Sequence, residues 1–175
     1  MPRNVEIKAR LESIAPLERQ VATLADSGPT LIRQDDTFFY CRQGRLKLRE
    51  FSPTEGELIF YRRSDVAGPK ESFFVISKTT EPDSLREVLT LAYGKAGRVR
   101  KERTLYLIGN TRVHLDRVED LGDFLELEVV LEDNDSLASG EETARQLLHR
   151  FYITEAQLVE RAYIDLIIAQ QQPFS

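Results

Sequence analysis

Residues 97–131 read GRVRKERTLYLIGNTRVHLDRVEDLGDFLELEVVL. Polar and apolar residues alternate along much of this stretch with a period of two, which is typical of β-strands with one buried face. The alternation is interrupted at Gly109-Asn110 and at Leu121-Gly122, and both dipeptides predict tight turns. We therefore predict three consecutive antiparallel strands, over residues 97–108, 111–118 and 123–131.

The same alternation continues toward the N-terminus and predicts five more strands, at residues 3–10, 31–40, 45–49, 57–63 and 71–78. Helical spacing predicts a helix after Ser13, a second over residues 85–92, a third over 141–151 and a last one opened by a capping box of Thr154 and Gln157. The predicted fold class is α+β, an eight-stranded antiparallel meander or β-barrel with flanking helices, forming a single domain over residues 1–175.

Composition excludes several classes of protein. The chain has 175 residues, a formal net charge of −5, one cysteine and two histidines. The acidic balance argues against a nucleic-acid partner, and no apolar run is long enough to cross a bilayer. Cys41 has no internal partner for a disulfide, and a zinc site built from His and Cys is improbable. The N-terminus predicts no signal peptide, so we expect a cytoplasmic protein with no membrane partner.

The polar sides of the predicted strands separate by charge. Cations prevail on three strands, whereas the last strand presents the pair Glu126 and Glu128; the cations are Arg45, Lys47, Arg49, Lys101, Arg103 and Arg112. One interpretation is an ordinary solvated face of a half-buried sheet. The other is a hydrated tunnel for phosphates, since burying so many cations is costly without a polyanion. The sequence pattern leaves both open.

Carboxylates favour the second interpretation. Glu126 and Glu128, with Asp116 on the neighbouring hairpin strand, supply the hard oxygen ligands that Mg²⁺ and Mn²⁺ prefer. Phosphate oxygens could complete such a coordination sphere, and the cations would neutralise the phosphates.

Several motifs occur in an order that points to a known family. Asn4–Lys8 is similar to an E-x-E-x-K signature, and further matches follow at Gln34–Phe39, Gly44–Arg49, Leu58–Arg63, Val99–Arg103, Arg112–Asp116, Leu121–Glu128 and Glu160–Tyr163. On these motifs the sequence resembles the CYTH superfamily, also called triphosphate tunnel metalloenzymes, and within it the class IV adenylyl cyclase-like branch.

The resemblance implies an eight-stranded antiparallel tunnel with site residues at matching positions. The implied triphosphate-binding residues are Lys8, Lys47, Arg49, Arg63, Lys101, Arg103, Arg112 and Arg161. The implied metal ligands are Glu6, Asp116, Glu126 and Glu128, which together with Lys8 form the implied catalytic set. One position departs from the signature: Asn4 replaces its first glutamate and brings no negative charge.

The resulting hypothesis is an enzyme that uses Mg²⁺ or Mn²⁺ to act on a triphosphate. By resemblance it would convert ATP to cyclic AMP and pyrophosphate. The same chemistry permits hydrolysis of tripolyphosphate, thiamine triphosphate or a nucleoside triphosphate. Two rivals are a non-catalytic polyphosphate or nucleotide binder and an interaction scaffold. We expect a monomer or a homodimer.

Overall fold

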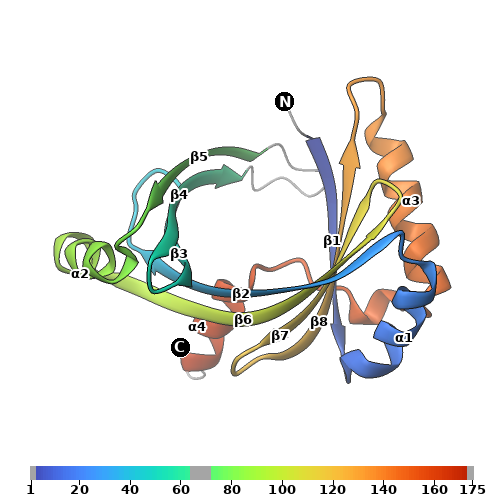
Figure 1. The fold of residues 1–175 in the computed structure, drawn as a ribbon, viewed down its shortest axis with the longest axis horizontal. Coiled ribbons are helices and arrows are strands. Elements are labelled where there is room, and N and C mark those ends of the chain that lie inside the picture. Colours follow the sequence, from blue (N-terminus) through green and yellow to red (C-terminus); the bar gives the residue numbers. More distant parts are fainter. Residues whose placement is uncertain (1–2, 64–71, 173–175) are drawn as a thin grey trace. The chain divides into compact units, whose positions relative to one another are not determined.

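The computed structural model of the protein describes residues 3–63 and 72–172. This part contains the eight predicted strands, four α-helices and one 3-10 turn (Figure 1). The strands are β1 Arg3–Leu11, β2 Ser27–Phe39, β3 Arg45–Ser52, β4 Glu55–Arg63, β5 Ser72–Thr79, β6 Lys95–Ile108, β7 Thr111–Val118 and β8 Gly122–Leu131. The helices are α1 Ile14–Leu24, α2 Pro82–Tyr93, α3 Leu137–Arg150 and α4 Tyr163–Gln171, with the 3-10 turn η1 at Glu155–Gln157.

All eight strands belong to one sheet. Hydrogen-bonded neighbours follow the order β1-β8-β7-β6-β2-β3-β4-β5, so β1 and β5 are its two ends. The pairs β1–β8, β7–β8, β2–β3, β3–β4 and β4–β5 are antiparallel. The predicted eight-stranded antiparallel fold with flanking helices is confirmed.

The chain divides into two compact units that cut across the sequence. Unit 1 consists of Met1–Ile32, Glu102–Val118 and Gly122–Glu160. Unit 2 consists of Arg33–Lys101, Glu119–Leu121 and Arg161–Ser175. Strands β2 and β6 each have one end in unit 1 and the other end in unit 2. The charged residues predicted from the sequence are therefore divided between the two units.

In unit 1, one face of β1, β7 and β8 packs against α1 and α3 (Figure 1). The strands contribute apolar side chains such as Ala9, Val113 and Leu127, all fully buried, and the helices contribute Ile14 and Leu148 among others. Because successive side chains of a strand point to opposite faces, this packing directs the alternate polar residues to the other face. The hydrophobic core of unit 1 thereby orients the predicted carboxylates.

Unit 2 has a smaller core beneath α2. Leu48 of β3 and Phe39 of β2 pack with Leu89 of α2. Gly94 ends α2 with φ +83°, a conformation in which a side chain would be strained. Leu48 is the apolar neighbour of Lys47 and Arg49, so its burial directs both cations to the opposite face of β3.

Three of the four predicted helices form where expected, and the last differs. Thr154 and Gln157 do make a capping box, but it opens only the 3-10 turn η1, and α4 begins at Tyr163. The prediction that this box starts the final helix is therefore wrong. Ser13 precedes α1 as predicted, yet its side chain makes no capping bond; the Asp123 carboxylate accepts from the Ile14 backbone N–H at 3.0 Å instead. None of the described helices has the length and apolarity to cross a membrane.

Candidate functional site

The strand register of unit 1 brings charged residues from three strands onto one face. Lys8 lies opposite Glu126, which lies opposite His114 on β7. One pair further along, Glu6 faces Glu128, which faces Arg112. Directly opposed residues of antiparallel strands project to the same side of a sheet. We call this side of β1, β7 and β8, together with Arg103 of β6, the charged face.

The charged face contains an ion-pair network centred on Arg103. Its Nε and Nη2 atoms donate to Oδ1 and Oδ2 of Asp116, both at 2.7 Å, and Nη2 also lies 3.2 Å from Oε2 of Glu126. Asp116 has 0% of its surface exposed. Burial raises the pKa of Glu126, but the charges of Arg103 and Lys8 outweigh it, and the net pKa is lowered. Glu126 is therefore a carboxylate at neutral pH.

Glu128 is held differently, by three side-chain donors. Asn4 Nδ2 donates to Oε1 at 2.8 Å, Arg112 Nη1 lies 3.4 Å from the same oxygen, and His114 Nε2 lies 3.1 Å from Oε2. The hydrogen bond from His114 is the main cause that lowers the pKa of Glu128. A carboxylate can only accept here, so His114 donates through Nε2.

The predicted metal ligands share the charged face but do not assemble into a metal cage. Oxygen donors are the right chemistry for Mg²⁺ or Mn²⁺, and Glu6, Asp116 and Glu126 fit it. Across residues 3–63 and 72–172, however, no three His, Cys, Asp or Glu side chains lie close enough together to hold an ion. Metal binding therefore requires the carboxylates to exchange some of their present partners.

Unit 2 contains a second cluster, in which cations surround a buried acid. Asp36 of β2 is 2% exposed and accepts from Lys47 Nζ at 3.1 Å and from Arg49 Nε and Nη2, both at 2.8 Å. Lys101 Nζ lies 4.0 Å away. Side-chain exposures of the three cations are 14%, 18% and 6%, so they are largely shielded from water. We call these four residues the Asp36 cluster.

Charge in the Asp36 cluster overrides the effect of burial. Burial alone raises the pKa of Asp36, but the charges of Lys47, Arg49 and Lys101 and the hydrogen bond from Arg49 place the pKa of this carboxyl well below its usual range. Asp36 is thus ionised across the physiological range and holds the arginine in a bidentate pair.

Comparison with known proteins assigns the family. Residues 2–163 match the family described as the CYTH domain. The chain belongs to the CYTH domain family. It is 27% identical over 174 residues to the adenylate cyclase CyaB of Aeromonas hydrophila, a match that covers 93% of this chain and 87% of that protein.

Solved structures agree with the CYTH fold. A protein of Pyrococcus horikoshii superposes with a TM-score of 0.80 at 23% identity, over 93% of this chain and 98% of that one. A Hippeastrum protein named as an adenylyl cyclase with a dominant triphosphatase activity superposes with a TM-score of 0.71 at 12% identity, over 98% of this chain and 96% of that one. The predicted family and fold are confirmed. The prediction of an enzyme is also supported, because CYTH proteins are adenylyl cyclases or triphosphatases.

The remaining predicted cations of this CYTH domain lie in less enclosed positions. Arg112 is exposed, and Arg161 is exposed with Nη2 3.4 Å from the Asp165 carbonyl oxygen. Arg63 is the last residue of β4, and its side chain lies outside the described part of the structure. Glu6 of β1 is exposed as well. The enclosed subset of predicted site residues is therefore Lys47, Arg49 and Lys101 in unit 2, and Arg103, Asp116, Glu126 and Glu128 in unit 1.

Sequence reasoning did not assign a role to Asp36. Its motif, Gln34–Phe39, matched a strand of the family, but no site residue was assigned within it. A signal was present, because Asp36 and Phe38 are two residues apart and therefore share one face of the strand with a large apolar side chain. Buried acids are rare unless they are paired. Such an acid predicts cationic neighbours, although only the fold identifies them.

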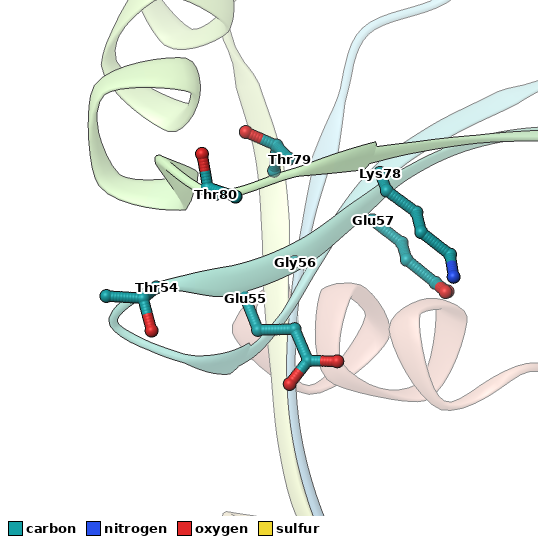
Figure 2. Close-up of a pocket in the computed structure, with 7 residues that line it drawn as sticks. All are labelled: Thr54, Glu55, Gly56, Glu57, Lys78, Thr79 and Thr80. Carbon is teal, nitrogen blue, oxygen red and sulfur yellow. The ribbon is translucent and has the colours of Figure 1, made fainter.

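One pocket is lined entirely by other residues. It has a volume of about 390 Å³ and lies in unit 2 where the β3–β4 turn approaches the end of β5 (Figure 2). Its lining residues are Thr54, Glu55, Gly56, Glu57, Lys78, Thr79 and Thr80. Glu57 and Lys78 are cross-strand partners and extend to the same side in Figure 2. The pocket contains none of the predicted site residues, so each of the two clusters is a candidate site in its own unit.

The substitution Asp36→Asn tests the cluster. Removing one partner from a buried ion pair leaves uncompensated buried charge, so we expect the free energy of unfolding at pH 7 to fall by about 3 kcal/mol. Because the pKa of Asp36 is lowered on folding, its contribution is present above the unfolded carboxyl pKa, about 3.9, and is lost as the pH falls through the folded value. Urea titrations at pH 7, 5 and 3 should show equal differences from wild type at the first two and a smaller one at pH 3.

The matched control is Asp35→Asn, on the adjacent position of β2. Asp35 pairs with Arg98 at 2.6 Å, but its side chain is 24% exposed. Ion pairs in contact with solvent contribute little, so we expect a loss below about 1 kcal/mol. Equal losses for the two variants would show that the Asp36 cluster is no more important to stability than a surface pair.

Proposed function

We propose that this CYTH protein is a divalent-metal-dependent enzyme that acts on a triphosphate and cyclises ATP to cyclic AMP and pyrophosphate. The observation that carries the proposal is the network on the charged face, where Asp116 and Glu126 share the single guanidinium of Arg103. Two ionised carboxylates beside a cation are suited to a divalent metal and a phosphate chain that enter together, because Arg103 can then transfer to a phosphate oxygen.

Unit 1 supplies the proposed metal ligands. A bound Mg²⁺ or Mn²⁺ would supply charge neutralisation and orientation of the phosphate oxygens. Asp116 and Glu126 would hold it, with Glu6 on the neighbouring strand as a further oxygen donor. Arg103 and Lys8, on the same charged face, would bind phosphate oxygens next to the metal.

Unit 2, taken by itself, contains a group of possible phosphate donors. Lys47, Arg49 and Lys101 are held by Asp36 in one cluster and are largely shielded from water. Donors that are oriented before the reaction stabilise developing negative charge without a reorganisation cost. In cyclisation the ribose 3′-oxygen bonds to the α-phosphorus and its proton passes to solvent, while the bond to the pyrophosphate oxygen breaks. Cations oriented as in the Asp36 cluster are suited to bind phosphate oxygens and the leaving pyrophosphate.

Hydrolysis of a triphosphate is the second candidate. The dominant triphosphatase activity named for the Hippeastrum protein supports it, since that protein shares the fold. Water would replace the ribose hydroxyl as the attacking group, and orthophosphate would be released. The CyaB relative supports cyclisation, because it is named an adenylate cyclase.

Product analysis distinguishes the two reactions. The protein is incubated with ATP, tripolyphosphate or thiamine triphosphate, with Mg²⁺ or Mn²⁺, and cyclic AMP, pyrophosphate and orthophosphate are measured. We expect equal amounts of cyclic AMP and pyrophosphate from ATP, and no product after the metal is removed with EDTA. Orthophosphate from tripolyphosphate without cyclic AMP from ATP would favour the hydrolase instead.

Two non-enzymatic functions have their own signatures in the same samples. A phosphate binder would show no product, but tripolyphosphate would raise its melting temperature in proportion to RT ln(1 + [L]/Kd). An interaction scaffold would show neither product nor a change in melting temperature. Either result would reject the proposed enzyme.

A further inference from the structure

Gln34 of β2 lies on the same face of its strand as Asp36. The two residues are two positions apart, about 6.5 Å along the strand, and alternate residues of a strand point to the same side. The register places Arg49 of β3 opposite Asp36, so this cation shares that side. Asp35, which lies between the two, points the other way and pairs with Arg98 at 2.6 Å. All of these residues belong to unit 2.

The side chain of Gln34 is buried with one polar atom unsatisfied. Gln34 is 8% exposed, and its carbonyl oxygen Oε1 has no hydrogen-bond partner among the described residues. Lys47 and Arg49 donate to Asp36 rather than to this oxygen. A buried carbonyl without a donor carries a desolvation cost, and such atoms are uncommon in folded proteins. Gln34 therefore offers a buried acceptor beside a group of cations that are suited to phosphate.

A phosphate chain cannot use this acceptor. Ionised phosphate oxygens only accept hydrogen bonds, as does the Gln34 carbonyl, so the two repel each other. A nucleoside carries the groups that can donate to it, namely the hydroxyls of its ribose and the amino group of its base. A site with a buried polar group rejects an analogue that leaves this group unpaired, because the desolvation cost then persists. The Gln34 carbonyl thus fits the organic part of a nucleoside triphosphate and not its phosphates.

We infer that Gln34 accepts a hydrogen bond from the nucleoside of a triphosphate whose phosphates bind the Asp36 cluster, and that it selects nucleotides over tripolyphosphate. The inference rests on the proposed function and adds a specificity-determining residue to the part of it that lies in unit 2. The cations of the Asp36 cluster give no such preference by themselves, since they bind the phosphates that both compounds carry. Gln34 adds a contact that only the nucleotide can make.

Gln34→Met tests this contact, because methionine has a similar length and shape but lacks the amide group. Isothermal titration calorimetry, with EDTA present to stop turnover, gives the dissociation constants for ATP and for tripolyphosphate. We expect the variant to bind ATP about tenfold more weakly, the effect of one lost hydrogen bond, and to bind tripolyphosphate within about twofold of wild type. Gln43→Met, in the exposed turn before β3, is the matched control and should leave both constants unchanged.

Three analogues identify the group that donates to Gln34. The compounds 2′-deoxyATP and 3′-deoxyATP each lack one ribose hydroxyl, and in inosine triphosphate a carbonyl replaces the amino group of the base. We expect wild type to bind one of the three about tenfold more weakly than ATP. Gln34→Met should bind that analogue and ATP alike, because the acceptor that distinguished them is gone. Wild type that bound all three as tightly as ATP would overturn the inference.

The free energy of unfolding separates a binding role of Gln34 from a structural one. Gln34→Met removes a buried oxygen that has no partner among the described residues, so urea titration should show a stability equal to wild type or higher. A loss of stability, equal weakening of ATP and tripolyphosphate binding, or wild-type affinity for ATP would each overturn the inference and leave the proposed function in place. If wild type bound neither compound, the Asp36 cluster would not be a phosphate site, and both the inference and the part of unit 2 in the proposed function would be rejected.

Discussion

Glu126→Gln is expected to reduce metal-dependent turnover at least about 100-fold while the fold survives. The substitution keeps the shape of the side chain and removes one negative charge from the charged face, where Glu126 lies beside Arg103 at 3.2 Å. Loss of a single electrostatic contact to a reacting centre commonly costs about 100- to 1,000-fold in rate. Initial rates with ATP and with tripolyphosphate, each at saturating Mn²⁺, measure the effect.

A matched control is Glu132→Gln, immediately after β8. Glu132 is exposed and lies outside the charged face. Its backbone N–H donates to the Asp135 carboxylate at 2.9 Å. It undergoes the same chemical change as Glu126, so we expect wild-type turnover. Unchanged activity in Glu126→Gln would remove this carboxylate from the mechanism, and a parallel loss in both variants would indicate a general charge effect.

Arg49→Ala is expected to weaken tripolyphosphate binding by about 30-fold, which corresponds to about 2 kcal/mol for lost hydrogen bonds to a charged group. Arg49 forms a bidentate pair with Asp36 and is only 18% exposed, so its guanidinium is oriented before any phosphate arrives. Arg49→Lys keeps the charge without the bidentate geometry, and we expect an intermediate loss. Isothermal titration calorimetry gives the dissociation constants.

The control for Arg49 is Arg42→Ala, in the turn before β3. Arg42 is exposed and is not part of the Asp36 cluster. Its substitution by alanine removes the same charge from unit 2 as Arg49→Ala does. We expect its affinity for tripolyphosphate to remain within about twofold of wild type, because exposed charges are screened by salt. If Arg49→Ala also stayed at wild-type affinity, β3 would have no part in phosphate binding.

The strands were predictable because their signal is local. Alternation of period two depends only on neighbouring residues, and it located all eight strands to within a few residues. The same alternation correctly predicted that Glu126 and Glu128 lie on the face opposite Leu127. It also placed Arg103 and Asp116 among the candidate residues before their contact was known.

The capping box of Thr154 is a case in which a local sequence signal did not predict the helix that follows. Its two hydrogen bonds formed as predicted, yet they opened a single 3-10 turn. A cap satisfies backbone groups at the start of a helix, but most helical stability comes from packing an apolar face. Tyr163, Ile164 and Ile167 provide buried side chains for α4, which begins only at Tyr163.

Which carboxylate meets which donor was decided by tertiary structure. Asn4 and Glu128 are 124 residues apart, and Asp36 meets Arg49 and Lys101 from separate strands. The positions of the strands, and the face of the sheet to which each side chain points, follow from periodicity along the chain. Both could therefore be predicted from the amino-acid sequence. Pairing between distant strands depends on register and on how the helices pack, and neither is encoded in any one segment. The division of the charged residues into an Arg103 network, the donors around Glu128 and an Asp36 cluster is therefore visible only in the folded chain.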